Sequence, residues 1–267
     1  MDQNLIAVIV GIVEGLTEFL PVSSTGHMII VGHLLGFDDH VADVFDIFVQ
    51  LGAILSVIFI YKERFIRFFT KDGWDMSKGL SVWHIAAGIV PVMLVAFFLY
   101  KYIKAYLFSP FTVCIGLVLG GLLLMYAERE TKGKEAELVD DIDKITIRQA
   151  MWVGIYQFLS LWPGFSRSGS TIAGGLLVGL NRQVAAHYTF LIAVPLMFVA
   201  CIYDLLKNLG GLTANDLQVL GIGFVVSFIV AYWSVLWFLK FLHRYDLTSF
   251  AWYRIVLACF TYWYFYL

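Results

Sequence analysis

Two stretches decide the fold: Leu20-Pro21-Val22-Ser23-Ser24-Thr25-Gly26 and Trp162-Pro163-Gly164-Phe165-Ser166-Arg167-Ser168-Gly169-Ser170. Each breaks an apolar segment near its middle, the first within residues 4–36 and the second within residues 147–180. Proline ends a helix because it lacks a backbone N–H and clashes with the preceding turn, whereas serine and threonine favour the start of a new helix. Each half is too short to cross a bilayer, which takes about 20 helical residues. We therefore predict two re-entrant helix–loop–helix hairpins, whose irregular backbone must be covered by protein or line a wet cavity.

The chain as a whole has the composition of a membrane protein. Of its 267 residues, 60% are apolar and 14% are charged, whereas soluble domains carry about 25% charged residues. No basic patch suits nucleic acid, so we expect no such partner. Six further apolar runs are long enough to cross the bilayer: residues 45–61, 83–100, 108–127, 185–206, 215–241 and 250–267. The predicted fold class is an all-α integral membrane protein with six transmembrane helices and two re-entrant hairpins.

The two broken segments also match each other. At an offset of 143 residues, ten of 28 positions are identical between residues 10–37 and 153–180, among them Ser23 with Ser166. Each half of the chain then holds one hairpin and three spans, and an odd number of crossings inverts the second copy relative to the first. We predict a first inverted repeat at 1–127 with hairpin 4–36, a polar cytoplasmic linker at 128–146, and a second inverted repeat at 147–267 with hairpin 147–180.

The basic residues predict the orientation of these repeats. Thirteen of them fall in the connections on one side of the predicted bilayer, against three on the other side. Cytoplasmic loops carry an excess of lysine and arginine, so the richer side is assigned to the cytoplasm. The N-terminus and the end of the last helix are then expected outside. The segments on the richer side are 62–82, 128–148, 181–184 and 240–249.

Two acidic residues lie within the first hairpin. Glu14 and Glu18 are four residues apart, so both project from one face of the first half-helix. Insertion scales give a cost of about 3 kcal/mol for such a group at the bilayer centre, and intramembrane ionisable residues usually mark a functional site. The alternative is a pair of protonated, packed carboxyls. Gln157 and Leu161 occupy the matching places in the second repeat, so the two hairpins are expected to form one composite site.

Hydroxyls and an imidazole surround the start of the next half-helix. They are Ser23, Ser24, Thr25 and His27. Exposed backbone N–H groups and the helix dipole make such a start attractive to an anion. Helix capping alone needs only one hydroxyl, so this cluster indicates a binding or catalytic site.

Arg167 stands at the corresponding start in the second hairpin. Arginine keeps its charge in proteins, and its planar fork fits phosphate oxygens. The alternative role is a salt bridge to Glu14 or Glu18. We expect the residues around Arg167 to help bind an anionic substrate: Ser166, Ser168, Gly169 and Thr171.

Two motifs resemble the signatures of the bacterial undecaprenyl-diphosphatase family of the bacitracin-resistance type: Glu14-Gly15-Leu16-Thr17-Glu18-Phe19-Leu20-Pro21-Val22-Ser23-Ser24-Thr25-Gly26-His27 and Pro163-Gly164-Phe165-Ser166-Arg167-Ser168-Gly169. The resemblance covers essentially the whole chain. It implies an inner-membrane enzyme that cleaves undecaprenyl diphosphate to undecaprenyl phosphate and inorganic phosphate, recycling the lipid carrier of cell-wall peptidoglycan synthesis. It further implies a site that faces the periplasm and depends on a divalent metal. The residues to which it assigns functional roles are Glu14, Glu18, Ser24, His27 and Arg167.

These residues permit a mechanism with three forms. One arginine does not balance a diphosphate, so we expect a divalent cation, Mg²⁺ or Ca²⁺, with Glu14 and Glu18 as ligands. Ser24 is the preferred nucleophile, and His27, three residues later, is its expected base. The two alternatives are direct attack by His27 and attack by a water that Glu18 activates.

Another class of function also fits the predicted topology. Broken helices in inverted repeats are typical of secondary transporters, so a flippase of a phosphorylated lipid or an anion transporter is the alternative. The cluster of acids, hydroxyls and imidazole favours the enzyme, because binding alone does not require it. The expected partners are the membrane and the diphosphate lipid, and a homodimer is compatible with the sequence.

Overall fold

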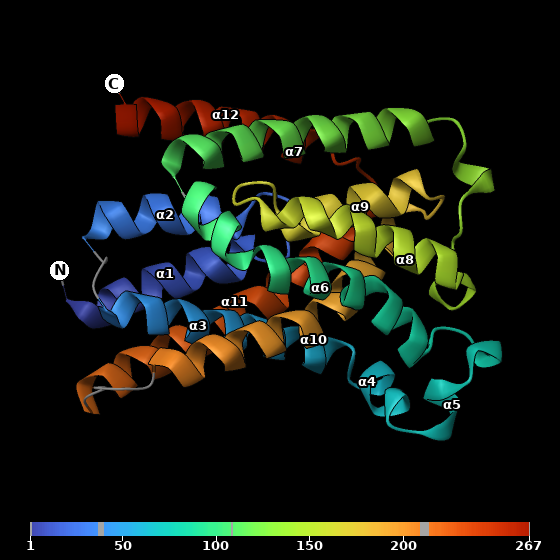
Figure 1. The fold of residues 1–267 in the computed structure, drawn as a ribbon, viewed down its shortest axis with the longest axis horizontal. Helices are drawn as coiled ribbons and strands as arrows, with labels where there is room; N and C mark the ends of the chain where they lie inside the picture. Colours follow the sequence, from blue (N-terminus) through green and yellow to red (C-terminus); the bar gives the residue numbers. More distant parts are fainter. Residues whose placement is uncertain (1, 37–39, 108, 209–213, 267) are drawn as a thin grey trace.

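The computed structural model describes residues 2–36, 40–107, 109–208 and 214–266, and within these ranges every named element is a helix (Figure 1). The all-α fold is therefore confirmed. Both broken segments form a helix, a break and a second helix that returns beside the first (Figure 1). The first consists of α1 (Gln3–Thr17) and α2 (Ser24–Leu35). The second consists of α8 (Ile147–Tyr156), the 3₁₀ turn η4 (Gln157–Leu161) and α9 (Arg167–Leu177).

One long helix lies at each of the six predicted spans. They are α3 (His40–Ile60), α6 (Val82–Tyr106), α7 (Pro110–Thr131), α10 (Arg182–Asn208), α11 (Ala214–Leu242) and α12 (Thr248–Tyr266). Helices α6, α7, α10 and α11 are long and apolar enough to cross a membrane, and α3 joins α4 (Lys62–Phe68) through an 85° bend to make a fifth candidate. The multi-pass membrane fold is thus confirmed. Because α12 carries Arg254 and many tyrosines and tryptophans, its crossing stays a prediction. Residues 108 and 267, at the ends of two predicted spans, lie outside the described ranges.

An ion pair joins two of the polar connections, which contain four further short helices. They are α5 (Lys71–Trp74), η1 (Met76–Lys78), η2 (Glu135–Glu137) and η3 (Ile142–Lys144). Arg64 donates two hydrogen bonds to the Asp143 carboxylate, at 2.5 and 2.8 Å, and the Leu80 N–H donates a third at 2.9 Å. The Arg64 guanidinium holds the pKa of the Asp143 carboxyl below its usual range. These bonds fasten the linker between the repeats to the connection that precedes α6.

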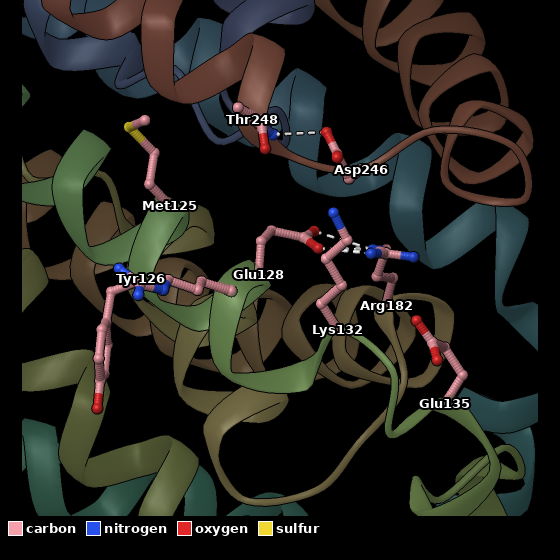
Figure 2. A pocket seen from close by; sticks show the side chains of 9 residues that line it. Met125, Tyr126, Glu128, Lys132, Glu135, Arg182, Asp246 and Thr248 are labelled. Atoms are coloured by element: carbon pink, nitrogen blue, oxygen red, sulfur yellow. Dashed lines mark hydrogen bonds and ion pairs between the residues drawn. The ribbon is translucent and has the colours of Figure 1, made fainter.

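A second ion pair joins α7, α10 and the approach to α12 (Figure 2). The Nη2 and Nε atoms of Arg182 bond the Glu128 carboxylate at 2.6 to 3.0 Å. The Leu247 N–H donates to the same carboxylate at 3.0 Å, and Asp246 accepts from the Thr248 N–H to begin α12. Arg182 and Glu128 are thus hydrogen-bonded to other parts of the protein, so we assign this ion pair a role in stabilising the fold.

The two hairpins enter the molecule from opposite ends of its long axis, and their breaks face each other near the middle (Figure 1). Both chain termini lie at one end, whereas α4, α5 and the linker lie at the other (Figure 1). This placement agrees with the sidedness expected from the basic residues. Beside the breaks lies the main apolar core, in which the buried Phe19 ring meets the buried Phe190 ring edge-on at 5.5 Å.

Each hairpin packs on a helix of the other proposed repeat: α1 on α11, and α8 on α6. Close approach requires glycine at the matching positions Gly11 and Gly154. A Cβ atom at Gly11 would lie 3.0 Å from the carbonyl oxygen of Gly223, and one at Gly154 would lie 2.6 Å from that of Gly88. Small residues allow such backbone contact between membrane helices. The exchange of partners supports the division into two inverted repeats, which stays a proposal.

Candidate active site

The two breaks share an unusual backbone conformation. Ser23 and Ser166, at matching positions of the two hairpins, have φ angles of 71° and 69° and are the only non-glycine residues with positive φ in the described chain. Such strain costs about 1–3 kcal/mol and clusters at functional sites. Each serine also caps the helix that follows: Ser23 Oγ accepts from the Gly26 N–H at 3.4 Å, and Ser166 Oγ from the Gly169 N–H at 3.1 Å. The starts of α2 and α9 are therefore built in the same way.

The two breaks meet through a chain of polar contacts. Arg167 Nη2 lies 2.8 Å from Glu18 Oε1, and the Ser24 hydroxyl donates to Glu18 Oε2 at 2.6 Å. The Glu18 and Arg167 side chains are only 9% and 13% exposed, and the guanidinium also lies over the Phe19 ring. The Ser168 hydroxyl ties the breaks together by donating to the Leu20 carbonyl at 2.8 Å. An acid, a hydroxyl and a guanidinium from the two hairpins thus come together, as the sequence led us to expect.

A polar cavity of about 200 Å³ opens beside these contacts. Six of the expected site residues line it: Glu18, Ser23, Ser24, Thr25, Ser166 and Arg167. The remaining wall comes from Gln50, Ser160, Trp162, Pro163, Gly164 and Met197. Anion-binding groups therefore surround a space for a small polar ligand. Leu20 and Val22 of the first break also line an apolar groove of about 750 Å³, between α1, α11 and α12.

Glu14 is buried, with 1% exposure, and lies outside the cavity wall. Its carboxyl group lies close to two other acidic side chains, Glu18 and Asp46 of α3. The Oε1 atom of Glu14 has no hydrogen-bond partner in the described chain. A buried carboxylate oxygen without a donor is unfavourable unless a proton or a cation occupies it. The described residues contain no group of three histidine, cysteine, aspartate or glutamate side chains that could hold a metal. A divalent cation on Glu14 and Glu18 therefore fits only if phosphate and water supply further ligands, as they commonly do for Mg²⁺.

Both ring nitrogens of His27 have hydrogen-bond partners, and His27 does not line the cavity. Nδ1 lies 2.8 Å from the Ser23 carbonyl oxygen, and Nε2 lies 2.7 Å from the hydroxyl of Tyr253 in α12, whose ring stacks on the imidazole. Because a carbonyl only accepts, Nδ1 carries the proton and Nε2 accepts from Tyr253. The expected contact between His27 and Ser24 is not formed. In this structure the Ser24 hydroxyl has Glu18 as its partner.

Three of the expected substrate-binding residues lie behind the cavity wall. Ser168 and Thr171 are buried, and Thr171 Oγ1 donates to the Arg167 carbonyl at 2.8 Å while accepting from Thr189 at 2.9 Å. The Gly169 N–H is bonded to Ser166 Oγ. These groups shape the start of α9, whereas Ser23, Thr25 and Ser166 face the cavity.

Sequence reasoning passed over Arg254, which the structure places beside the second break. It is fully buried in α12 and bonds the carbonyl oxygens of Gly164 and Phe165 at 2.9 and 2.7 Å. The sequence did contain a signal for Arg254: it is a lone arginine inside an apolar run, and such a residue usually marks a functional site. Tyr253, the partner of His27, gave no signal in the sequence.

Comparison with known proteins bears on this arrangement. The family described as "Bacitracin resistance protein BacA" matches residues 7–260, which include both breaks. The chain belongs to the BacA family. Undecaprenyl-diphosphatase 1 of Bacillus thuringiensis (strain Al Hakam) and that of Bacillus anthracis are each 46% identical to it over 259 residues, 97% of each chain. Undecaprenyl-diphosphatase of Solidesulfovibrio magneticus has the same identity and coverage. The resemblance found in the two motifs is therefore confirmed, and this BacA family member is similar to those proteins over nearly its whole length.

Proposed function

We propose that this chain is a membrane undecaprenyl-diphosphatase, which hydrolyses undecaprenyl diphosphate to undecaprenyl phosphate and inorganic phosphate and so recycles the cell-wall lipid carrier. The contact of Glu18 with both Arg167 and Ser24 beside a polar cavity carries the proposal. The names of the relatives agree with it. The apolar groove that Leu20 and Val22 of the first break help to line suits a substrate that has a long hydrocarbon chain as well as a polar head.

The head group is proposed to bind between the starts of α2 and α9. Arg167 exchanges its hydrogen bond to Glu18 for bonds to phosphate oxygens, which its fork fits. Glu18, freed from the guanidinium, accepts the proton of the Ser24 hydroxyl, with which it is already in contact. Ser24 Oγ then bonds to the terminal phosphorus while the bond to the bridging oxygen breaks, and undecaprenyl phosphate leaves. The leaving undecaprenyl phosphate takes up that proton from Glu18, which can then deprotonate a water. The water oxygen bonds to the phosphorus as the bond to Ser24 Oγ breaks, and Ser24 Oγ regains the proton from Glu18 as inorganic phosphate leaves.

His27 has a different proposed role from that expected for a base. Its bonds to the Ser23 carbonyl and to Tyr253 hold the strained residue that precedes Ser24. This geometry favours Ser24, or a water activated by Glu18, over His27 as the attacking group. Ser23, Thr25 and Ser166 are proposed to contact the phosphates from the cavity wall. Ser168, Gly169 and Thr171 are proposed to support that wall.

A divalent cation, Mg²⁺ or Ca²⁺, is proposed to bind Glu14 and Glu18, because Glu14 keeps a buried oxygen without a donor. When bound, such an ion polarises a phosphoryl group and offsets the charge of the leaving phosphate. Phosphate release by purified protein in detergent, from a short-chain isoprenyl diphosphate, tests the function and the ion together. We expect steady turnover that falls to background with excess EDTA and returns with added Mg²⁺. Full activity in EDTA would exclude the metal, and no release under any condition would favour the transporter alternative.

The finer placement in the cell is also a proposal. The surplus of lysine and arginine in segments 62–82 and 128–148 supports a site that opens toward the periplasm from the inner membrane. The division at residues 128–146 into two inverted repeats is supported by the matching backbone at Ser23 and Ser166. A homodimer stays a prediction.

A further inference from the structure

Arg254 is buried without an opposite charge. Its exposure is 0%, and within the described ranges it forms no ion pair. Of its nitrogen atoms, only Nη2 donates hydrogen bonds within the described chain. These bonds go to the carbonyl oxygens of Gly116, Gly164 and Phe165, at 3.3, 2.9 and 2.7 Å. Its Nε and Nη1 atoms have no partner in the described chain. An arginine keeps its charge, so this arrangement is unfavourable for stability alone.

The surrounding backbone leaves room for this guanidinium. A Cβ atom at Gly120 of α7 would clash with Arg254 Nη2, and one at Gly169 of α9 would lie 2.7 Å from Nη1. A Cβ atom at Gly116 would lie 2.5 Å from the Pro163 carbonyl oxygen. Glycines on two helices therefore let Arg254 and the second break approach each other closely.

The bonds of Arg254 set the direction of the peptide groups in the break. In a planar trans peptide the carbonyl and the N–H point in opposite directions. The carbonyls of Gly164 and Phe165 face Arg254, so the N–H groups of Phe165 and Ser166 face away from it. The Phe165 N–H bonds the Trp162 carbonyl at 3.0 Å, whereas the Ser166 N–H has no partner among the described residues. Gly164 and Ser166 line the polar cavity, but Arg254 does not.

We propose that Arg254 is a positioning residue for the diphosphate head group: it fixes the second break so that the Ser166 N–H donates to a phosphate. The positive charge of Arg254, which has no ion-pair partner in the described chain, also attracts the phosphate bound at that N–H. The other cation of the site, Arg167, is already paired with Glu18. Backbone donors that are oriented in advance bind an anion without the cost of reorganisation. An opposite charge acts more strongly inside a protein than in water. Arg254 thus adds to Arg167 and the proposed divalent cation in offsetting the negative charge of the diphosphate.

This inference rests on the proposed site, and inhibition by inorganic pyrophosphate separates the two. We compare Arg254→Met, which removes charge and fork, with Arg254→Lys, which keeps the charge. The control is Arg182→Lys, at the Glu128 ion pair. We expect the inhibition constant for pyrophosphate to rise about ten-fold or more in Arg254→Met, less in Arg254→Lys, and less than about two-fold in the control. A merely structural role would lower kcat through the fraction of active protein and leave the inhibition constant unchanged.

The proposal would be contradicted if folded Arg254→Met had the same inhibition constant for pyrophosphate as the wild-type protein. If that variant does not fold, Arg254→Lys and Gly120→Ala decide the matter, because a methyl group at residue 120 would lie too close to both the guanidinium and the Phe165 carbonyl, and so disturbs their contact without removing Arg254. Failure of all three to fold would assign Arg254 to stability and overturn the proposal. Arg167→Lys is measured in parallel: an unchanged constant there would show that the proposed site, and not only the role of Arg254, is wrong.

Discussion

Replacing Arg167 by lysine will lower kcat/KM for phosphate release by about 10²-fold or more, although the positive charge is kept. Lysine is a point charge with a flexible stem, and it does not reproduce the planar fork that can hold two phosphate oxygens. Removing a single group that stabilises transition-state charge commonly costs a factor of about 10² to 10³. The Arg167 guanidinium is oriented by Glu18 on one side and by the Phe19 ring on another, and the tetrahedral ammonium of a lysine does not reproduce this planar arrangement.

The measurement for Arg167→Lys is initial-rate phosphate release in detergent, from a soluble isoprenyl diphosphate. Arg182→Lys is the matched control, since Arg182 is also an ion-paired arginine but bonds Glu128 away from the site. Both variants must elute as folded protein. An Arg167→Lys enzyme with near wild-type kcat/KM would remove Arg167 from phosphate binding.

Replacing Ser24 by alanine will abolish most turnover, with a fall in kcat of at least about 10³-fold, as expected for a nucleophile that acts together with its base. The Ser24 hydroxyl donates to Glu18 at 2.6 Å, so its proton already has an acceptor. Single-turnover reactions with substrate labelled in the terminal phosphate should also trap label on the wild-type protein and none on Ser24→Ala.

The control for this prediction is Ser56→Ala. Ser56 is buried in α3 and donates to the Ala53 carbonyl of its own helix, far in sequence from either break. The serine route would be excluded if Ser24→Ala had near wild-type turnover and no label were trapped on Ser24→Ala or on the wild-type protein. Attack by a water that Glu18 activates would then be the mechanism.

The broken segments and their convergence could be predicted because local chemistry encodes them. Proline and serine at Pro21 and Ser23 favour the end of one helix and the start of another through local effects on the backbone. Costly charges at bilayer depth indicated that Glu18 and Arg167 belong to one site. An internal match at an offset of 143 residues indicated that the hairpins face each other, although Glu18 and Arg167 are 149 residues apart.

What the sequence did not reveal depends on contacts between distant helices. His27 looked like a base for Ser24 because only three residues separate them, yet its ring turns to Tyr253, 226 residues away. Arg254 was counted only as a residue of the last span, since its partners lie in the second break, 89 and 90 residues away. Helix periodicity places a residue on a face, and only packing decides what that face meets.

The most direct test of the shared site is a double-mutant cycle on kcat/KM for phosphate release, with Glu18→Gln, Arg167→Lys and the double variant. If the two hairpins form one catalytic unit, the double variant will be little worse than the more damaged single variant, because residues that act together are strongly non-additive. Losses that simply multiply would mean that Glu18 and Arg167 act independently, and they would contradict a single site built from both hairpins.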